Sequence, residues 1–232
     1  MRHIGILAHS ADGAALCFLE MVRESARRLG AHRHPEITLS ILPMGTVLDA
    51  YARGDLATVN GHLQHTCRRL AAAGCDFYAC PDNTAHLAID VATTPYPIPG
   101  LHIADVVAAA ARSEGRRSVA LLGTRWTMEG GTYRAAFARA GIALVTPEPA
   151  ERAVIDRVIF EELCRGLVSD ASRADVVRVI GRLRLGGCDA VALACTELPL
   201  LVTPDVSPLP TLDSTRLLAR AAVERAMDDP GH

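Results

Sequence analysis

The sequence predicts an α/β protein built from two similar halves, each with a parallel sheet covered by helices on both faces. Three observations predict this class. Short apolar runs alternate with segments of helical periodicity, two segments half a chain apart resemble each other, and several apolar runs end in small or polar residues. In open α/β sheets, ligands bind beyond the carboxyl ends of the strands, so these endings predict the position of a site.

The strands are predicted from continuous apolar runs and the helices from the apolar faces between them. The expected strands are Ile4–Ala8, Ile37–Leu42, Phe77–Cys80, Val119–Leu122, Leu144–Thr146 and Val191–Ala194. The expected helices are Ala15–Leu29, Leu56–Ala73, Ile103–Ser113, Thr132–Ala140, Val154–Leu167, Arg173–Leu185 and a last one over about Ser214–Met227.

An internal repeat relates residues 74–84 to residues 187–197. Each segment begins Gly-Cys-Asp, continues with a short apolar run and reaches Asp82 or Cys195 eight residues after its glycine, so both pairs are 113 residues apart. A repeat of this size indicates two copies of a half-domain, since solenoid periods are much shorter. Two copies that face each other would direct Asp82 and Cys195 into one cleft, toward opposite faces of a carbon atom.

Proline-rich passages divide the chain. The stretch 93–100 has three prolines within five residues and cannot be regular structure, so it is the expected crossover between halves. A second such passage, 203–210, precedes the last predicted helix, which we expect to return to the first half. The predicted lobes are therefore 1–98 plus about 212–232, and 99–211.

Composition excludes several functions. The net charge of −2 and the absence of a basic cluster argue against nucleic acid and membrane surfaces as partners. Seven cysteines without metal-ligand spacing predict reduced thiols in a cytoplasmic protein that binds no metal. All 24 basic residues are arginine. Pyridoxal phosphate requires a lysine Schiff base and the phosphate-loop motif also requires lysine, so we expect no cofactor.

Cys195 and Asp82 are the candidate catalytic residues. Cys195 ends a predicted strand, where unpaired backbone N–H groups would lower the pKa of its thiol from about 8.5. The alternative is a buried structural cysteine. Asp82 is the opposing acid–base candidate if apolar surroundings raise its pKa from about 3.9. Its alternative role is to cap a helix that begins near Thr84.

The candidate binding residues follow the same strand ends. Asn83, Thr84 and Thr196, with the N–H groups around them, form two similar anion-binding loops for a carboxylate. Ser10, Thr124 and Glu197 complete the predicted pocket, although serine and threonine at strand ends are often ordinary caps.

Two further residues have open interpretations. His86 either supports the loop that follows Asp82 or takes part in catalysis. Arg165 comes late in a predicted helix, before Gly166. It is either a helix C-terminal charge or an anchor for a second substrate carboxylate.

Four motifs, in order over nearly the whole chain, resemble the aspartate/glutamate racemase superfamily. They are Pro81-Asp82-Asn83-Thr84-Ala85-His86, Leu122-Gly123-Thr124 with Thr127-Met128, Cys195-Thr196-Glu197-Leu198-Pro199 and Asp213-Ser214-Thr215. The resemblance implies cofactor-independent chemistry at the α-carbon of a carboxylate. It also implies two Rossmann-like domains with four-stranded sheets related by a pseudo-two-fold axis, with the active site in the cleft between them, and a homodimer.

The resemblance also implies roles for individual residues. Cys195 matches the second catalytic cysteine; Asn83, Thr84 and Thr196 match carboxylate binders, and Arg165 matches a basic position near the distal substrate group. The chain departs from the pattern at Asp82, where typical members have the first catalytic cysteine. It also departs at its amino terminus, where Ala8-His9-Ser10 replaces a Gly-Gly-Met-Ser type of motif.

These residues leave three hypotheses. The leading one is a racemase or epimerase that moves a proton between Asp82 and Cys195 on an amino acid or related carboxylate, at unequal rates in the two directions. The second is a one-cysteine lyase that decarboxylates a malonate-type substrate and protonates the carbanion. The third is a carboxylate-binding protein without catalysis.

Overall fold

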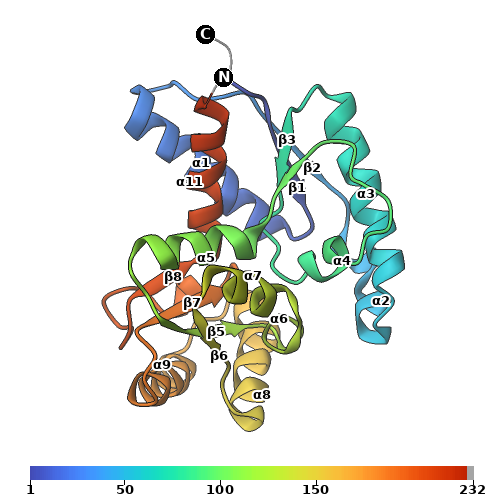
Figure 1. The fold of residues 1–232 in the computed structure, drawn as a ribbon. Helices are drawn as coiled ribbons and strands as arrows, with labels where there is room; N and C mark the ends of the chain where they lie inside the picture. Colours follow the sequence, from blue (N-terminus) through green and yellow to red (C-terminus); the bar gives the residue numbers. More distant parts are fainter. Residues whose placement is uncertain (229–232) are drawn as a thin grey trace. The chain divides into compact units, whose positions relative to one another are not determined.

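The computed structural model describes residues 1–228, and they form two compact units, each with one four-stranded parallel sheet (Figure 1). Unit 1 comprises Met1–Ile103 and the C-terminal segment from Thr215, and unit 2 comprises Ala104–Ser214. Residues 229–232, which the sequence assigns to the first lobe, lie outside the described residues. The predicted α/β class with parallel sheets is confirmed.

The sheet of unit 1 has the strand order β2-β1-β3-β4, and all its pairs are parallel. Every residue of β1 and β3 is buried, which explains why these strands are continuous apolar runs. The strands are β1 (Ile4–Ala8), β2 (Ile37–Ile41), β3 (Phe77–Ala79) and β4 (Gly100–Leu101).

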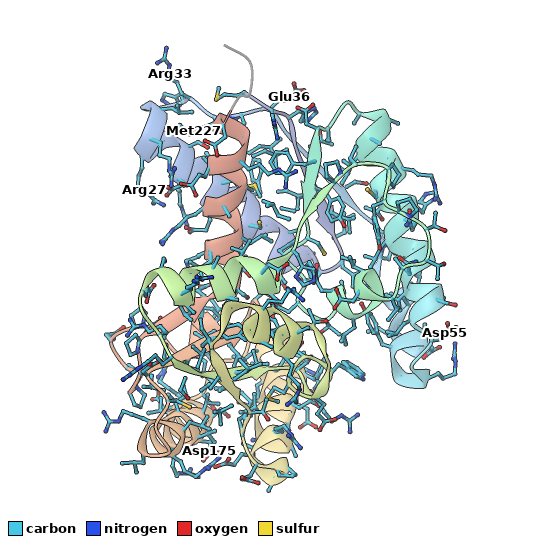
Figure 2. The ribbon with its side chains drawn as sticks, in the orientation of Figure 1. Arg27, Arg33, Glu36, Asp55, Asp175 and Met227 are labelled. Carbon is cyan, nitrogen blue, oxygen red and sulfur yellow. The ribbon has the colours of Figure 1, made fainter. Side chains whose placement is uncertain are left out.

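The two long helices α1 and α3 of unit 1 begin at polar caps, and the unit also includes the last helix of the chain. The carboxylate of Asp55 (labelled in Figure 2) accepts a hydrogen bond from the N–H of Thr58, 3.0 Å away, and so starts α3. In α11, Arg225 lies over the ring of Phe77, 4.8 Å from its centroid. The helices are α1 (Ala11–Leu29), η1 (Met44–Thr46), α2 (Leu48–Arg53), α3 (Leu56–Ala72), α4 (His86–Asp90) and α11 (Ser214–Met227).

Unit 2 repeats this topology, since its strand order β6-β5-β7-β8 has the same sequence relations as that of unit 1. The central strand β7 is fully buried, and β5 is buried apart from its first residue. The strands are β5 (Ser118–Gly123), β6 (Ala143–Val145), β7 (Ala190–Ala194) and β8 (Thr211–Asp213). The sequence repeat therefore corresponds to a repeat of the fold.

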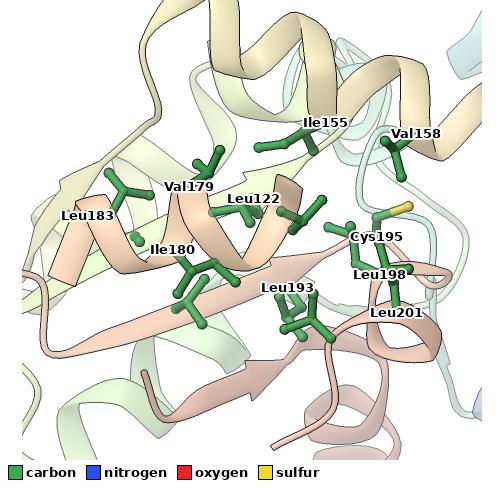
Figure 3. Packing of buried hydrophobic residues seen from close by; sticks show 14 of the residues in the cluster. Leu122, Ile155, Val158, Val179, Ile180, Leu183, Leu193, Cys195, Leu198 and Leu201 are labelled. Carbon is green, nitrogen blue, oxygen red and sulfur yellow. The ribbon is translucent and has the colours of Figure 1, made fainter. Parts of the chain in front are cut away.

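The core of unit 2 fills the space between β5, β7 and the helices α8 and α9, with Cys195 at its edge (Figure 3). The helix expected over 154–167 begins earlier, at Pro149, and changes after Arg157 into a π-helical turn and a 3-10 turn. The helices are α5 (Ile103–Ser113), α6 (Arg125–Glu129), α7 (Thr132–Ala140), α8 (Pro149–Arg157), η2 (Val158–Glu162), η3 (Leu163–Arg165), α9 (Asp170–Leu185) and α10 (Leu198–Leu201).

The repeated Gly-Cys-Asp segments are structural. Gly74 and Gly187 have φ values of 83° and 97°, which glycine adopts without strain. The carboxylate of Asp76 accepts the N–H of His3 at 2.6 Å, and that of Asp189 accepts the N–H of Arg117 at 2.8 Å. Each aspartate therefore ties the start of its strand to the residues just before or at the start of the neighbouring strand.

Two strands, β4 and β8, were not predicted from the sequence. They are two and three residues long, and each follows a proline-rich passage that suppresses a strand signal. Gly100 in β4 also has no side chain to add to an apolar pattern. A Cβ atom at this position would collide with the ring of Tyr78, so close packing requires the glycine.

Candidate active site

In unit 1, the predicted site residues lie beyond the carboxyl ends of β1 and β3. Asp82 follows β3 by three residues, and its carboxylate reaches the turn between β1 and α1. There it accepts hydrogen bonds from the N–H of His9 at 3.0 Å and the N–H of Ser10 at 3.1 Å. These donors and the N-terminus of the 19-residue helix α1 stabilise a charged carboxylate.

The carboxylate of Asp82 contacts the start of α1, whereas the alternative prediction was that it caps a helix near Thr84. The following helix, α4, begins at His86 after Ala85, and no side chain caps it. Asp82 accepts hydrogen bonds at the start of α1, about seventy residues away in sequence. Only the parallel pairing of β1 with β3 brings these two strand ends together.

The loop after Asp82 is held from inside the unit. Asn83 is buried, and its carbonyl oxygen accepts the N–H of His86 at 3.2 Å. The Nε2 of His86 donates to the carbonyl oxygen of Cys80, 3.1 Å away, so the ring is tied to this loop. A part in catalysis stays a prediction. The thiol of Cys80 is fully buried, and burial, followed by the charge of Asp82, raises its pKa well above the ordinary value.

A cluster that sequence reasoning missed adjoins Asp82. His9 is 1% exposed, and its ring makes edge contacts with Tyr51 on α2 and His62 on α3, at centroid separations of 5.5 and 5.8 Å. Burial and then the charge of His62 lower the pKa of His9 to about 4, so its imidazole is neutral near pH 7. The signal in the sequence was a histidine directly before Ser10, at the end of the first strand.

In unit 2, Cys195 directly follows β7 and donates its thiol hydrogen to Glu197. The Sγ atom lies 2.9 Å from Oε2 of Glu197, and both side chains are buried. Burial, and then the carboxylate of Glu197, raise the pKa of the Cys195 thiol well above its usual value. The N–H of Glu197 acts in the opposite direction but does not prevail. The predicted lowering of this pKa is therefore wrong, because desolvation and the adjacent anion outweigh the backbone donor.

Two predicted binding residues serve as helix caps. The Oγ of Ser10 accepts the N–H of Gly13 at 3.3 Å at the start of α1, and Thr124 accepts the N–H of Thr127 at 3.3 Å at the start of α6. These caps place both hydroxyls at strand ends, as expected, and they correspond to the alternative reading of these residues. Their contact with substrate stays a prediction.

The remaining candidates differ in exposure. Thr84 and Thr196 are half-buried, whereas Arg165 is exposed at the end of η3, before Gly166 with φ of 73°. The guanidinium of Arg165 has no hydrogen-bond or ion-pair partner among residues 1–228, so it is available to an anion. Its predicted role as an anchor for a second carboxylate stays a prediction, as does the joint action of Asp82 and Cys195.

The described residues offer neither a metal-binding cluster nor a membrane-spanning helix. Within residues 1–228, no group of three or more His, Cys, Asp or Glu side chains could hold a metal ion. In the same part of the chain, no helix is both long and apolar enough to cross a membrane.

Comparison with known proteins gave consistent relationships. A sequence model of the family described as Asp/Glu/hydantoin racemase matches residues 11–222. The crystal structure of a provisionally assigned Asp/Glu racemase from Yersinia pestis is 31% identical in sequence, with a TM-score of 0.90. The match covers 98% of this chain and 100% of that one. An aspartate racemase homologue from Pyrococcus horikoshii OT3 is 26% identical with a TM-score of 0.84 and the same coverage. The aspartate racemase of Picrophilus torridus shares the fold, at 23% identity and a TM-score of 0.77 over 97% of this chain and 94% of that one.

Proposed function

Because the chain belongs to the Asp/Glu/hydantoin racemase family, we propose that it is an amino-acid racemase or epimerase that needs no pyridoxal phosphate. Asp82 and Cys195 exchange the α-proton of a small carboxylate from opposite faces of its α-carbon. Asn83, Thr84 and Thr196 bind the α-carboxylate. The absence of lysine from the sequence supports chemistry without a Schiff-base cofactor.

The observation that carries this proposal is the buried pair formed by Cys195 and Glu197. A thiol that donates to a carboxylate at 2.9 Å has an immediate acceptor for its proton. The raised pKa of Cys195 means that the resting enzyme holds the protonated thiol. The resting enzyme can therefore donate a proton at Cys195, and Asp82, which backbone N–H groups hold as a charged carboxylate, is the group that accepts one.

The reaction then runs in two steps. Asp82 removes the α-proton, and the electron pair of the broken C–H bond delocalises into the substrate carboxylate. The thiol of Cys195 gives its proton to the opposite face, which restores the C–H bond with inverted configuration and leaves a thiolate. That thiolate lies beside the carboxylate of Glu197, and two adjacent anions are unfavourable in a buried site.

The same pair accounts for the expected asymmetry. In the reverse direction the thiolate of Cys195 must be the base, and it forms when its proton passes to Glu197. Because burial opposes that thiolate, we expect the substrate whose proton Asp82 removes to react faster from the resting enzyme.

The test is exchange of the α-proton in D2O over a panel of amino acids, followed by NMR together with optical rotation. The wild-type protein should incorporate deuterium and invert the configuration. Cys195→Ala and Asp82→Asn should each abolish inversion. Cys188→Ala is the matched control: it removes another buried thiol of the same unit, the one in the Gly-Cys-Asp segment, and should retain activity. Absence of exchange with every amino acid, in folded wild-type protein, would contradict the proposal.

One observation also favours a second candidate. A buried thiol in an apolar cluster is suited to protonating a carbanion, which is the step that a one-cysteine decarboxylase requires. Release of carbon dioxide from an arylmalonate, with no exchange on amino acids, would support that reaction instead.

A further inference from the structure

Next to Asp82, unit 1 buries a histidine whose ring has no hydrogen-bond partner in the described part of the chain. Neither Nδ1 nor Nε2 of His9 is hydrogen-bonded within residues 1–228, although the side chain is 99% buried. Buried polar groups are nearly always paired, and those that are not call for a physical reason. A ligand that completes the pairing is one such reason.

The ring of His9 faces further polar groups from two other elements. It contacts the ring edges of Tyr51 and His62, and the Nε2 of His62 is also buried without a partner in the described chain. The Nδ1 of His62 lies 3.3 Å from the hydroxyl of Thr46 in η1. Three buried imidazole nitrogens of two neighbouring rings thus lack partners within one small region.

The region lies against the candidate catalytic group. The backbone N–H of His9 donates to the carboxylate of Asp82 at 3.0 Å. Burial is the main cause of the raised pKa of Tyr51, and the negative charge of Asp82 is the second, so Asp82 acts on the cluster electrostatically. A substrate whose α-carbon meets Asp82 can therefore place its side chain near these rings.

Charge decides which side chain fits. Burial, the largest cause for each ring, lowers the pKa of both His9 and His62, so both are neutral near pH 7. A carboxylate buried beside neutral rings and the carboxylate of Asp82 would lack a compensating cation. A neutral imidazole has one donor and one acceptor nitrogen, and a carboxamide pairs with both kinds, whereas a carboxylate pairs only with donors.

We propose that His9 and His62 form a subsite for an uncharged hydrogen-bonding group of the substrate, with a carboxamide as the best match. The inference rests on the proposed function and narrows its substrate class. This subsite would bind the distal group of the substrate. Arg165, by contrast, would suit a substrate whose distal group is a second carboxylate. The buried ring of His9 contacts Tyr51 of α2, so a ligand must displace part of this packing to reach the ring nitrogens.

The first experiment measures binding in the Cys195→Ala variant, so that no turnover interferes. Calorimetric titrations compare two isosteric pairs, asparagine with aspartate and glutamine with glutamate. We expect at least one amide to bind about tenfold or more tightly than its acid. His9→Phe, which keeps a planar ring without nitrogens, should remove this preference. His65→Phe, at an exposed position on α3, the helix that carries His62, should not.

A second measurement does not depend on how well the variants fold. In wild-type protein with ¹⁵N-labelled histidine, addition of the preferred amide should shift the ring-nitrogen resonances of His9, and aspartate should not. Equal or tighter binding of the acids, no binding of any of the four, a preference that survives His9→Phe, or unchanged His9 resonances would each overturn the subsite. The two proposals can be distinguished. If amides bind selectively to the folded protein but no α-proton exchanges, the proposed function is contradicted and the subsite is not.

Discussion

Acidification should destabilise this protein through His9 by an amount that the structure allows us to work out. Burial is the main reason why the pKa of His9 falls from 6.5 to about 4, and the charge of His62 adds to it. The unfolded chain therefore takes up a proton at His9 before the folded protein does. The free energy of unfolding must rise with pH between about 4 and 6.5, and the stabilisation is complete above the unfolded pKa.

The magnitude follows from the same two values. A shift of about 2.5 pKa units corresponds to about 3 kcal/mol in the limit of low pH. Between pH 7.5 and pH 4.5, linkage predicts that His9 alone removes about 2.5 kcal/mol of the free energy of unfolding. The side chain is 1% exposed, so solvent screening does not reduce this figure much.

The assay is urea denaturation at pH 7.5, 6.5, 5.5 and 4.5 for the wild-type protein and for His9→Phe. Carboxylates and other histidines titrate in both proteins, so the difference between the two curves isolates His9. The wild-type protein should lose about 2.5 kcal/mol more than the variant over this range. His65→Phe, at an exposed position, should follow the wild type much more closely than His9→Phe does, because His65 makes only the smaller contribution to the lowered pKa of His62. Parallel curves for wild type and His9→Phe would refute the reasoning.

Two further predictions concern the thiol and the sheet. Glu197→Gln removes the anion that is the second cause, next to burial, of the raised pKa of Cys195, so the pH midpoint for alkylation of this thiol should fall. Glu161→Gln, at an exposed position in the same unit, should leave the midpoint unchanged, and an unaltered midpoint in Glu197→Gln would contradict the pairing. Gly100→Ala places a Cβ against the ring of Tyr78 and should lower the free energy of unfolding, measured by urea denaturation, by about 1–3 kcal/mol. Gly61→Ala in α3, where a Cβ meets nothing within 4 Å, should not lower it, and equal stability of the two variants would argue against the close packing.

Much of the fold was predictable because it depends on local pattern. The buried strands β1 and β7 are continuous apolar runs, and the helices α5 and α7 begin and end at the predicted residues. The short strands β4 and β8 were not predictable, since their residues carry no apolar period. Their positions depend on hydrogen bonding to strands already in place.

The candidate site divides in the same way. The 113-residue repeat, the residues Asp82 and Cys195 and their placement after buried strands are properties of the sequence itself. The partners of these residues are not. Asp82 meets the N–H of His9 only because β1 and β3 pair in parallel, and the cluster of Tyr51, His62 and His9 forms only when α2 and α3 pack beside that turn.

The sequence alone therefore determined the class of fold, the repeated half and the candidate reactive groups, because these depend on residue type and spacing. The tertiary structure decided their electrostatic state. Cys195 rests as a thiol, and His9 is neutral, because burial withdraws solvent from charges and because Glu197 and His62 lie within reach. Desolvation and proximity arise only when distant segments pack, so no local pattern could have shown them.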